Sequence, residues 1–366
     1  MKIPLANPAR ELNKIKNFES RFNKKLKNGI YVGGKDVLTF EENVANYIGS
    51  KYCVTVNSGT DALLLSLMAL GIKKGDKVMV PSFTFFATIE VVMHLGAVPV
   101  FVEINKETYT FDIDDFKKKV NKTIKAVIPV HLFGNNSNIE IIKNICNKYN
   151  LKIIEDVAQA FGSGTKNNRK LGSIGDMGAF SFFPSKTLGG IGDGGCVVTN
   201  NLSQYKKILK LRNHGQGKNY EHEFVGINSR LDSLNAFVLN EKLSIFQEIK
   251  KSRNDFYNFY INNLSHLEWI NLPTKENENI ILNYFTITVS PLIRNKLLSY
   301  LNQHQIGASI YYKKPIHLQK AVLDKYERVS LKKTEKISKS IISLPFYSFP
   351  KDDELEYLVA KIKKFK

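Results

Sequence analysis

The chain has 366 residues, 43% of them hydrophobic and 24% charged, which is enough for one large domain and a smaller second one. No apolar run approaches the ~20 residues that span a bilayer and no signal peptide is evident, so we expect a cytoplasmic protein with no membrane partner. The formal charge of +19 is spread along most of the sequence and no nucleic-acid-binding motif is present, so we predict no nucleic-acid partner. Two explanations of the charge stay open, namely solvated surface lysines and attraction of a doubly charged nucleotide sugar.

Short β-branched runs alternate with amphipathic segments as far as Asp156. The predicted elements are, in chain order, strand 52–57, helix 61–70, strand 77–80, helix 87–95, strand 98–104, helix 113–120, strand 125–130, helix 139–149 and strand 151–156. This alternation indicates βαβ units, and therefore a parallel or mixed sheet with helices on both faces.

The pattern changes after Asp156. Residues 179–183 and 196–199 are predicted as strands joined by a glycine-rich loop, and a long helix is expected from Asp232 to about Ile249. Farther along, strands 281–289 and 308–312 indicate a second, smaller α/β domain. We predict a large domain of residues 1–250 and a small C-terminal domain of residues 251–366.

A turn of small residues, Ser58-Gly59-Thr60, follows the first predicted strand and opens the next helix. Backbone N–H groups at a helix N-terminus form a ready phosphate site. Ordinary helix capping by Ser58 or Thr60 explains the same residues equally well.

Two other strand ends carry candidate ligand contacts. Asp156 ends its strand at the sheet edge where open α/β proteins bind ligands, and a carboxylate there can keep the pyridine nitrogen of pyridoxal 5'-phosphate protonated. An N-cap aspartate would have the same sequence context. Phe83, Phe85 and Phe86 follow the strand 77–80, where an aromatic side chain could stack on a cofactor ring or belong to the core.

Lys186 lies between the strand 179–183 and a run of glycines. Desolvation and neighbouring cations at such a position lower the pKa of an amine and free it to condense with an aldehyde. The string from Gly190 to Gly195 has the G-x-G-x-x-G spacing of a dinucleotide site, but it precedes a strand instead of opening a helix, so we reject that interpretation. The three cysteines and seven histidines lack metal-site spacing, and we predict no metal.

A phosphate turn, an aromatic residue, an acid and a lysine thus follow the strands of one predicted sheet. From about Gly33 to His317 the chain resembles the fold-type I nucleotide-sugar aminotransferases of the DegT/StrS family. The resemblance implies a mixed, mostly parallel seven-stranded sheet flanked by helices, a smaller C-terminal α/β domain and bound pyridoxal 5'-phosphate. It also implies a homodimer with shared active sites that transfers the amino group of L-glutamate to a keto nucleotide sugar, in surface polysaccharide synthesis such as that of the lipopolysaccharide O-antigen.

The family's functional positions map onto this sequence residue by residue. Lys186 matches the Schiff-base lysine and proton carrier, Asp156 the partner of the pyridine nitrogen, and Asn228 an asparagine that reaches the phosphate of the neighbouring subunit's cofactor. The other matched cofactor contacts are the phosphate turn Gly59 and Thr60, the phosphate-binding Ser181, the ring-hydroxyl partner Gln159 and the stacking Phe85.

The same resemblance narrows the range of candidate substrates. The chain is most similar to the subgroup that aminates C3 of UDP-2-acetamido-3-keto-hexuronic acids, in which Arg230 would meet the sugar carboxylate with Tyr312 and His317 nearby. An ion pair between Arg230 and Asp232 is the alternative. Where the subgroup has His-Tyr-Pro, this chain has Tyr311-Tyr312-Lys313.

Other functions stay open. The run from Pro315 to Gln319 is also common in enzymes that aminate dTDP-3-keto-6-deoxyhexoses, and a 4-keto sugar is a further alternative. A dehydratase of the same fold would carry histidine in place of Lys186. A non-catalytic basic binding or regulatory protein would not require the complete set of Asp156, Gln159, Ser181 and Lys186.

Overall fold

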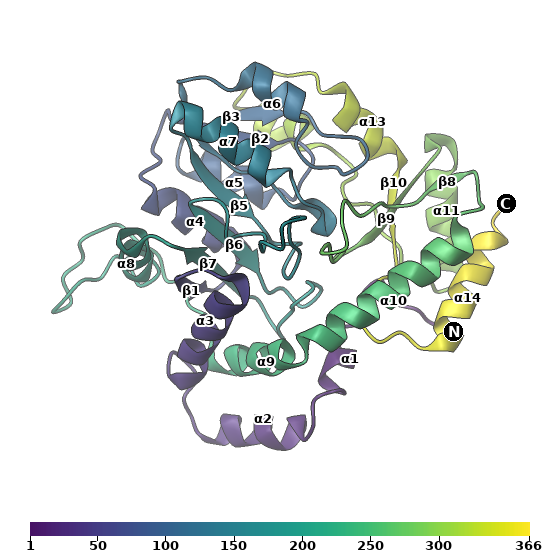
Figure 1. The fold of residues 1–366 in the computed structure, drawn as a ribbon, viewed down its shortest axis with the longest axis horizontal. Coiled ribbons are helices and arrows are strands. Elements are labelled where there is room, and N and C mark those ends of the chain that lie inside the picture. The colour runs from purple at the N-terminus through teal and green to yellow at the C-terminus, as the bar shows by residue number, and fades with distance from the viewer.

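A computed structural model describes residues 1–366. In Figure 1 a central sheet surrounded by helices is connected to a smaller sheet by the long helix α10 (Phe246–Leu264). The central sheet has seven strands in the order β1-β7-β6-β5-β4-β2-β3. β7 is antiparallel to both of its neighbours, and every other pair is parallel. The predicted mixed, mostly parallel seven-stranded sheet is confirmed.

The predicted strands and helices of this region are present with small shifts at their ends. The strands are β1 Tyr52–Val56, β2 Lys77–Pro81, β3 Val98–Val102, β4 Ile124–Val127, β5 Lys152–Asp156, β6 Met177–Ser181 and β7 Gly195–Thr199. The helices that correspond to predictions are α4 Gly59–Ala69, α5 Ala87–His94, α6 Ile113–Lys119, α7 Ile139–Tyr149 and α9 Ser233–Ser244. Two further helices, α3 Lys35–Ile48 and α8 Leu202–Leu211, were not predicted. As predicted, the glycine string leads into β7 and opens no helix.

Each face of the central sheet carries its own hydrophobic cluster. Val197 of β7 belongs to one cluster, whereas its neighbours Cys196 and Val198 belong to the other, because successive side chains of a strand point to opposite faces. Helices α4, α5 and α8 contribute to the first cluster, and α3, α6, α7 and α9 to the second. The sheet is therefore covered on both sides, which leaves its strand ends as the open edge.

The smaller sheet is antiparallel and has the order β10-β9-β8, with β8 Ile270–Asn271, β9 Phe285–Val289 and β10 Ile341–Leu344. It packs with α10, α11 (Pro291–Gln303) and α14 (Asp352–Lys363) around a third core that includes Tyr260 and Leu358. Ile3 from the N-terminus joins this core, and both termini lie at this end of the molecule (Figure 1). The remaining helices are α1 Ala9–Leu12, α2 Phe18–Lys27, α12 Lys320–Leu323 and α13 Lys332–Ser340.

Two predictions for the C-terminal part were wrong. Residues 308–312 form no strand: only Ser309 pairs, with Ser343, because the chain then turns back to the large sheet, where the Ile316 amide donates to the Ser82 carbonyl at 3.0 Å. The expected helix from Asp232 to Ile249 is two helices, since the backbone of Ile245 (φ −104°, ψ 15°) separates α9 from α10. The predicted domain division after residue 250 falls inside α10 and stays a prediction.

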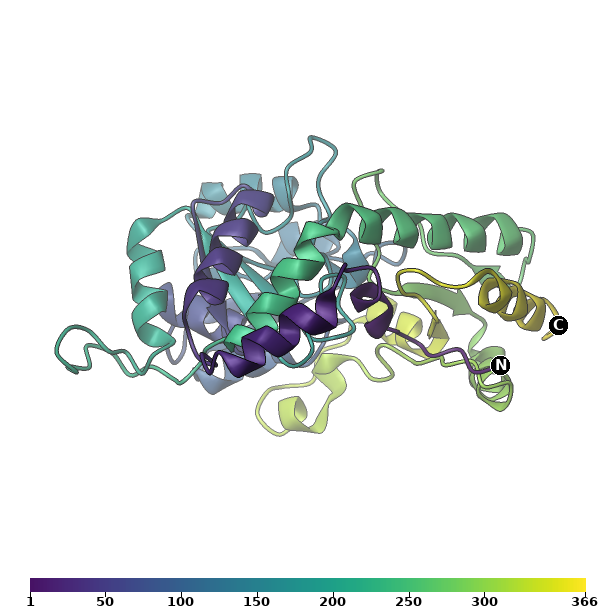
Figure 2. The same cartoon turned by 90° about the horizontal axis from the view of Figure 1, so that it is seen from below.

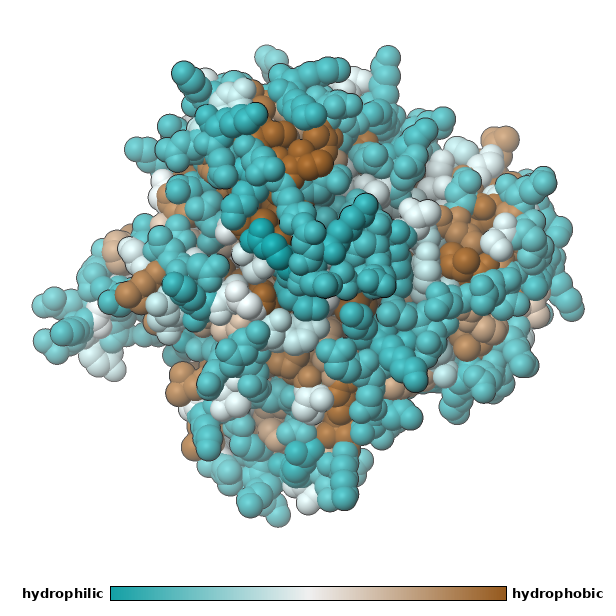
Figure 3. All heavy atoms as spheres, viewed as in Figure 1, coloured by the Kyte–Doolittle hydropathy of each residue, from teal (hydrophilic) through white to brown (hydrophobic).

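None of the helices is both long and apolar enough to cross a membrane. Figure 3 shows a largely hydrophilic face with separate hydrophobic patches. Among the 53 lysines and arginines, Lys242, Arg253 and Arg294 are buried and Lys186 is partly buried, and most of the positive charge is exposed to solvent.

Candidate active site

A cavity of about 720 Å³ opens at the C-terminal ends of β1, β2, β5 and β6, where an open α/β sheet is expected to bind ligands. Its floor consists of residues at the ends of β1, β5 and β6 and the loop after β6. Its rim is formed partly by residues 311–319, here called the rim segment, of which Tyr311–Lys314, Ile316 and Gln319 line the cavity. Residues predicted from the sequence that line it are Gly59, Thr60, Phe85, Asp156, Gln159, Ser181, Lys186 and Tyr312.

The turn after β1 starts helix α4 on the floor of the cavity. The Ser58 hydroxyl accepts from the Asp61 amide at 3.1 Å, so the capping interpretation is confirmed. The first N–H groups of a helix have no intrahelical partner, which leaves those of Gly59 and Thr60 available to an anion. A Cβ on Gly59 would lie 2.7 Å from that of Ser181, so glycine is required for α4 to begin against the end of β6.

Asp156 is buried at the end of β5, with both carboxylate oxygens engaged. One accepts from the Ala158 amide at 3.1 Å and the other from the Thr88 hydroxyl at 2.9 Å. Burial raises the pKa of the Asp156 carboxyl, while these hydrogen bonds and the charge of Lys186 act in the opposite direction. Thr88 was not predicted as a site residue, although its place in the first turn of α5, the helix that follows β2, is a signal for it.

Lys186 lines the same cavity from the loop after β6. Its amide donates to the Phe183 carbonyl at 2.8 Å, which closes the turn that directs the side chain inward. Burial lowers the pKa of Lys186 to about 8, against the opposing effect of Asp156. Such an amine is partly uncharged near neutral pH and can act as a nucleophile or a base.

Tyr312 connects the rim segment to the floor. Its hydroxyl accepts from Gln159 Nε2 at 3.0 Å, and Gln159 Oε1 accepts from the Phe133 amide at 2.9 Å. The Tyr312 ring lies 5.9 Å from that of Phe83 and 6.3 Å from that of Phe85. Phe83 is buried in the core, and Phe86 lines the cavity but is partly buried against the core. Phe85 is 58% exposed and borders the cavity, the position expected of a stacking aromatic.

The other predicted residues lie outside this cavity. Asn228 and Arg230 are exposed, and Arg230 Nε donates to Asn228 Oδ1 at 2.9 Å instead of pairing with Asp232, which caps α9. His317 is buried: its Nδ1 bonds to Ser82 and its Nε2 lies 3.3 Å from a Glu335 carboxylate oxygen. Both ring nitrogens of His317 are therefore engaged within the chain. The prediction that His317 contacts the substrate is corrected: its ring holds the rim segment to Ser82 and Glu335.

Pyridoxal 5'-phosphate fits these donors. Free helix N–H groups and the Ser181 hydroxyl suit its phosphate, the Asp156 carboxylate suits its ring nitrogen, and the Lys186 amine suits its aldehyde. The close approach of Gly59 to Ser181 leaves a cradle that a side chain at position 59 would fill. No group of three or more His, Cys, Asp or Glu side chains is placed to hold a metal ion.

Comparison with known proteins gives long matches. The model of the DegT/DnrJ/EryC1/StrS aminotransferase family matches residues 13–363. The chain is 37% identical over 351 residues to the dTDP-3-amino-3,6-dideoxy-alpha-D-galactopyranose transaminase of Aneurinibacillus thermoaerophilus, covering 96% of this chain and 95% of the relative. It is 37% identical over 324 residues to the UDP-2-acetamido-2-deoxy-3-oxo-D-glucuronate aminotransferase of Pseudomonas aeruginosa, covering 88% and 89% of the two.

A solved structure agrees with these matches. The structure of S. venezuelae DesV in complex with a ketimine intermediate has a TM-score of 0.94 and 31% identity, covering 100% of this chain and 98% of that one. Aminotransferases of the matched family depend on pyridoxal 5'-phosphate. The chain therefore belongs to the DegT/DnrJ/EryC1/StrS family and is a pyridoxal-phosphate-dependent aminotransferase.

Proposed function

We propose that the chain transfers the amino group of L-glutamate to the C3 ketone of a UDP-2-acetamido-3-keto-hexuronic acid. The convergence of Lys186, Asp156 and the Gly59–Ser181 contact in one cavity is the observation that carries the amino transfer. The two relatives described above are named for a 3-oxo sugar and a 3-amino sugar, which supports C3. A dTDP-3-keto-6-deoxyhexose is the second candidate, because the dTDP-sugar relative is equally identical at 37%.

Lys186 and Asp156 have the central roles in the proposed reaction. Bound pyridoxal 5'-phosphate supplies an electron sink. Lys186 Nζ would hold the cofactor and, once released, would take a proton from the Cα of the amino donor in the first half-reaction and give a proton to the ketone carbon of the sugar in the second, a task suited to an amine with a pKa of about 8. Asp156 holds the ring nitrogen and is itself held by Thr88, which fixes the orientation of its carboxylate.

The remaining floor and rim contacts bind and cover the cofactor. The N–H groups of Gly59 and Thr60 and the Ser181 hydroxyl receive the phosphate. Gln159 would hold the ring hydroxyl, and Phe85 would stack on the ring and exclude water from it. The presence of these residues in the lining of the cavity supports the assignments.

We infer that the protein is a homodimer in which Asn228 and Arg230 complete the cavity of the partner subunit. The segment between α8 and α9, which carries both residues, projects from the body in Figures 1 and 2. It exposes Tyr220 by 83% and Val225 by 90%, which a partner would cover. The bond from Arg230 to Asn228 leaves most of the guanidinium donors free for a sugar carboxylate.

We further propose that the reaction is a cytoplasmic step in the synthesis of a surface polysaccharide such as the lipopolysaccharide O-antigen. The three cysteines are buried and unpaired, as in proteins of reducing compartments.

One experiment separates the candidate substrates. The enzyme is converted with glutamate to its colourless pyridoxamine phosphate form and offered each keto sugar nucleotide separately, while the yellow absorbance is followed. Return of the yellow form with the UDP-3-keto-uronate is expected. Its return with the dTDP-deoxysugar alone would overturn the uronate proposal, and its return with a 4-keto sugar alone would overturn C3 amination.

A further inference from the structure

Two neighbouring lysines of the rim segment, Lys313 and Lys314, line the cavity. Both are exposed, and neither ammonium group has an ion-pair or hydrogen-bond partner in the chain, whereas the nearby Lys320 pairs with Asp324 at 2.6 Å. The carboxylates that line the cavity belong to Asp156, which is buried on the floor, and Asp193, which is not within ion-pair distance of either lysine. Two positive charges therefore face the cavity without compensation.

The backbone that carries these lysines is anchored on both sides. Before them, Tyr312 is hydrogen-bonded to Gln159, and after them His317 is buried and bonded to Ser82. The lysines are thus presented from a fixed backbone, so less conformational freedom is lost when they bind a ligand.

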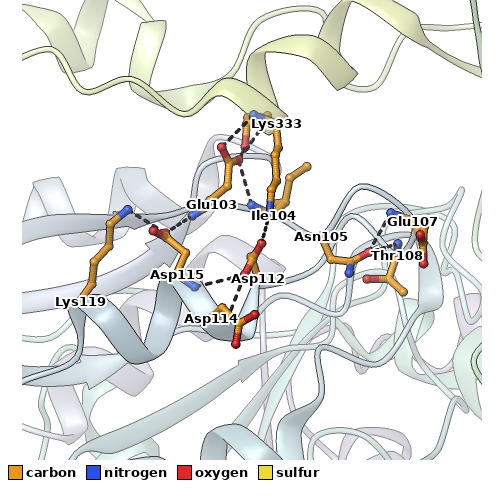
Figure 4. A network of polar contacts seen from close by, with 11 residues as sticks. Glu103, Ile104, Asn105, Glu107, Thr108, Asp112, Asp114, Asp115, Lys119 and Lys333 are labelled. Atoms are coloured by element: carbon orange, nitrogen blue, oxygen red, sulfur yellow. Dashed lines mark hydrogen bonds and ion pairs between the residues drawn. The ribbon is translucent and has the colours of Figure 1, made fainter.

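Helix α13, which follows α12 in the chain, is also attached to the large sheet, as Figure 4 shows. The Glu103 carboxylate at the end of β3 accepts from the amides of Lys333 and Thr334, each at 2.9 Å, and Lys333 Nζ pairs with Asp112. Glu335 of the same helix lies 3.3 Å from His317. These contacts hold the rim segment between the small sheet and the edge of the large one.

The chemistry of the two side chains indicates the group they receive. Ammonium groups act as separate point charges and bind phosphate well, while a single carboxylate is matched better by the planar fork of an arginine. Two adjacent ammonium groups complement a dianion whose charge is spread over two phosphates. The only anionic groups of the amino donor L-glutamate are carboxylates.

We propose that Lys313 and Lys314 bind the diphosphate bridge of the nucleotide-sugar acceptor and so select phosphorylated ketones over uncharged ones. The inference rests on the proposed function, because it takes the acceptor to be a nucleotide sugar. It assigns the lysines to the second half of the reaction alone, since glutamate reacts and leaves before the acceptor binds.

Steady-state kinetics can isolate that half, because in a ping-pong scheme kcat/KM of each substrate reports its own half-reaction. In the double variant Lys313→Met/Lys314→Met we expect kcat/KM for the nucleotide sugar to fall by about 10- to 100-fold, as for loss of two charge-assisted contacts. kcat/KM for glutamate should stay within about twofold. Lys313→Arg/Lys314→Arg should retain most activity, and Lys320→Met, outside the cavity, is the matched control. An equal fall for both substrates, or a fall for glutamate alone, would overturn the inference.

Calorimetric titration tests binding directly, with UDP, dTDP, uridine and glucose 6-phosphate as probes of the holoenzyme. We expect the double variant to lose affinity for UDP and dTDP by a similar factor and to leave that for uridine unchanged. If the lysines were needed to bind glucose 6-phosphate but not to bind UDP, they would recognise a terminal sugar phosphate instead of a diphosphate. That result would overturn the inference. If the enzyme aminated no nucleotide sugar but still bound UDP through the two lysines, the proposed function would be overturned and the diphosphate-binding site would be supported.

Discussion

The floor and the rim of the cavity differ in how they are built. The floor residues Gly59, Asp156, Ser181 and Lys186 lie at or after the ends of strands of one sheet and are packed or hydrogen-bonded within one chain. The rim segment is brought back from the smaller sheet, and its lysines are exposed and unpaired. Chemistry common to aminotransferases can be placed on the floor, while the choice of acceptor can vary on the rim without disturbing the sheet.

Among the substitutions that compare floor and rim, the one at the floor residue Lys186 should lower activity most. Lys186→Ala should lower turnover by about 10³-fold or more, because it removes both the cofactor attachment and the proton carrier. Absorbance spectroscopy should show no yellow protein, and circular dichroism should show an unchanged fold. Substantial transamination by this variant at saturating glutamate would show that the floor is wrongly assigned. Lys320→Met serves as the control for loss of one lysine.

Asp156 should give the next largest effect. Asp156→Ala removes the counter-charge of the ring nitrogen, so turnover should fall by about 10²-fold and cofactor should be lost more readily on dialysis. Asp156→Asn keeps the shape and should restore cofactor retention more than turnover. Near-normal turnover of the alanine variant in stopped-flow measurements would mean that another group partners the ring.

The pKa of Lys186 predicts how the floor responds to pH. Because burial lowers that pKa to about 8, the neutral amine is scarce at pH 6 and abundant above pH 8. The rate at which the apoprotein takes up pyridoxal 5'-phosphate should rise by roughly tenfold per pH unit below this pKa and level off above it. A rate that still climbed toward pH 10 would indicate an ordinary exposed amine.

Asn228 tests whether part of the rim comes from a second subunit. Asn228→Ala should lower activity by about tenfold, as for one phosphate contact. Mixing it with Lys186→Ala should restore about a quarter of wild-type activity, since about half of the randomly assorted dimers have one intact site. With subunit exchange verified by mass spectrometry, a mixture no more active than its components would contradict the shared site.

The smallest effect is expected where rim and floor meet. Tyr312→Phe removes the hydroxyl that accepts from Gln159 at 3.0 Å but keeps the ring against Phe85. A neutral hydrogen bond contributes about 1 kcal/mol, so kcat/KM for the sugar should change by about fivefold. Measured with each substrate in turn, a loss of 100-fold would show that the Tyr312 hydroxyl takes part in the chemistry.

Local patterns determined much of this fold. Alternating strand and helix signals located the strands and helices from β1 to β5, but not α3, and α7 begins and ends at the predicted residues Ile139 and Tyr149. The same signals failed at residues 308–312, which have a strand-like composition but form a turn. Contacts of Tyr312 with Gln159 and of Ile316 with Ser82 compete there with strand pairing in the small sheet. Residues that border two sheets are decided by such distant contacts, which periodicity does not contain.

The sequence by itself determined which chemistry the floor can support, because Gly59, Asp156 and Lys186 lie at or just after the ends of strands that share one edge, and the family resemblance added Ser181. Only the tertiary structure decided that Thr88 holds Asp156, that both nitrogens of His317 are engaged beneath the rim, and that Lys313 and Lys314 face the cavity unpaired. These contacts join residues tens to hundreds of positions apart. Packing between separate elements determines which residues meet in these contacts, and the local spacing of residues in the sequence does not predict it.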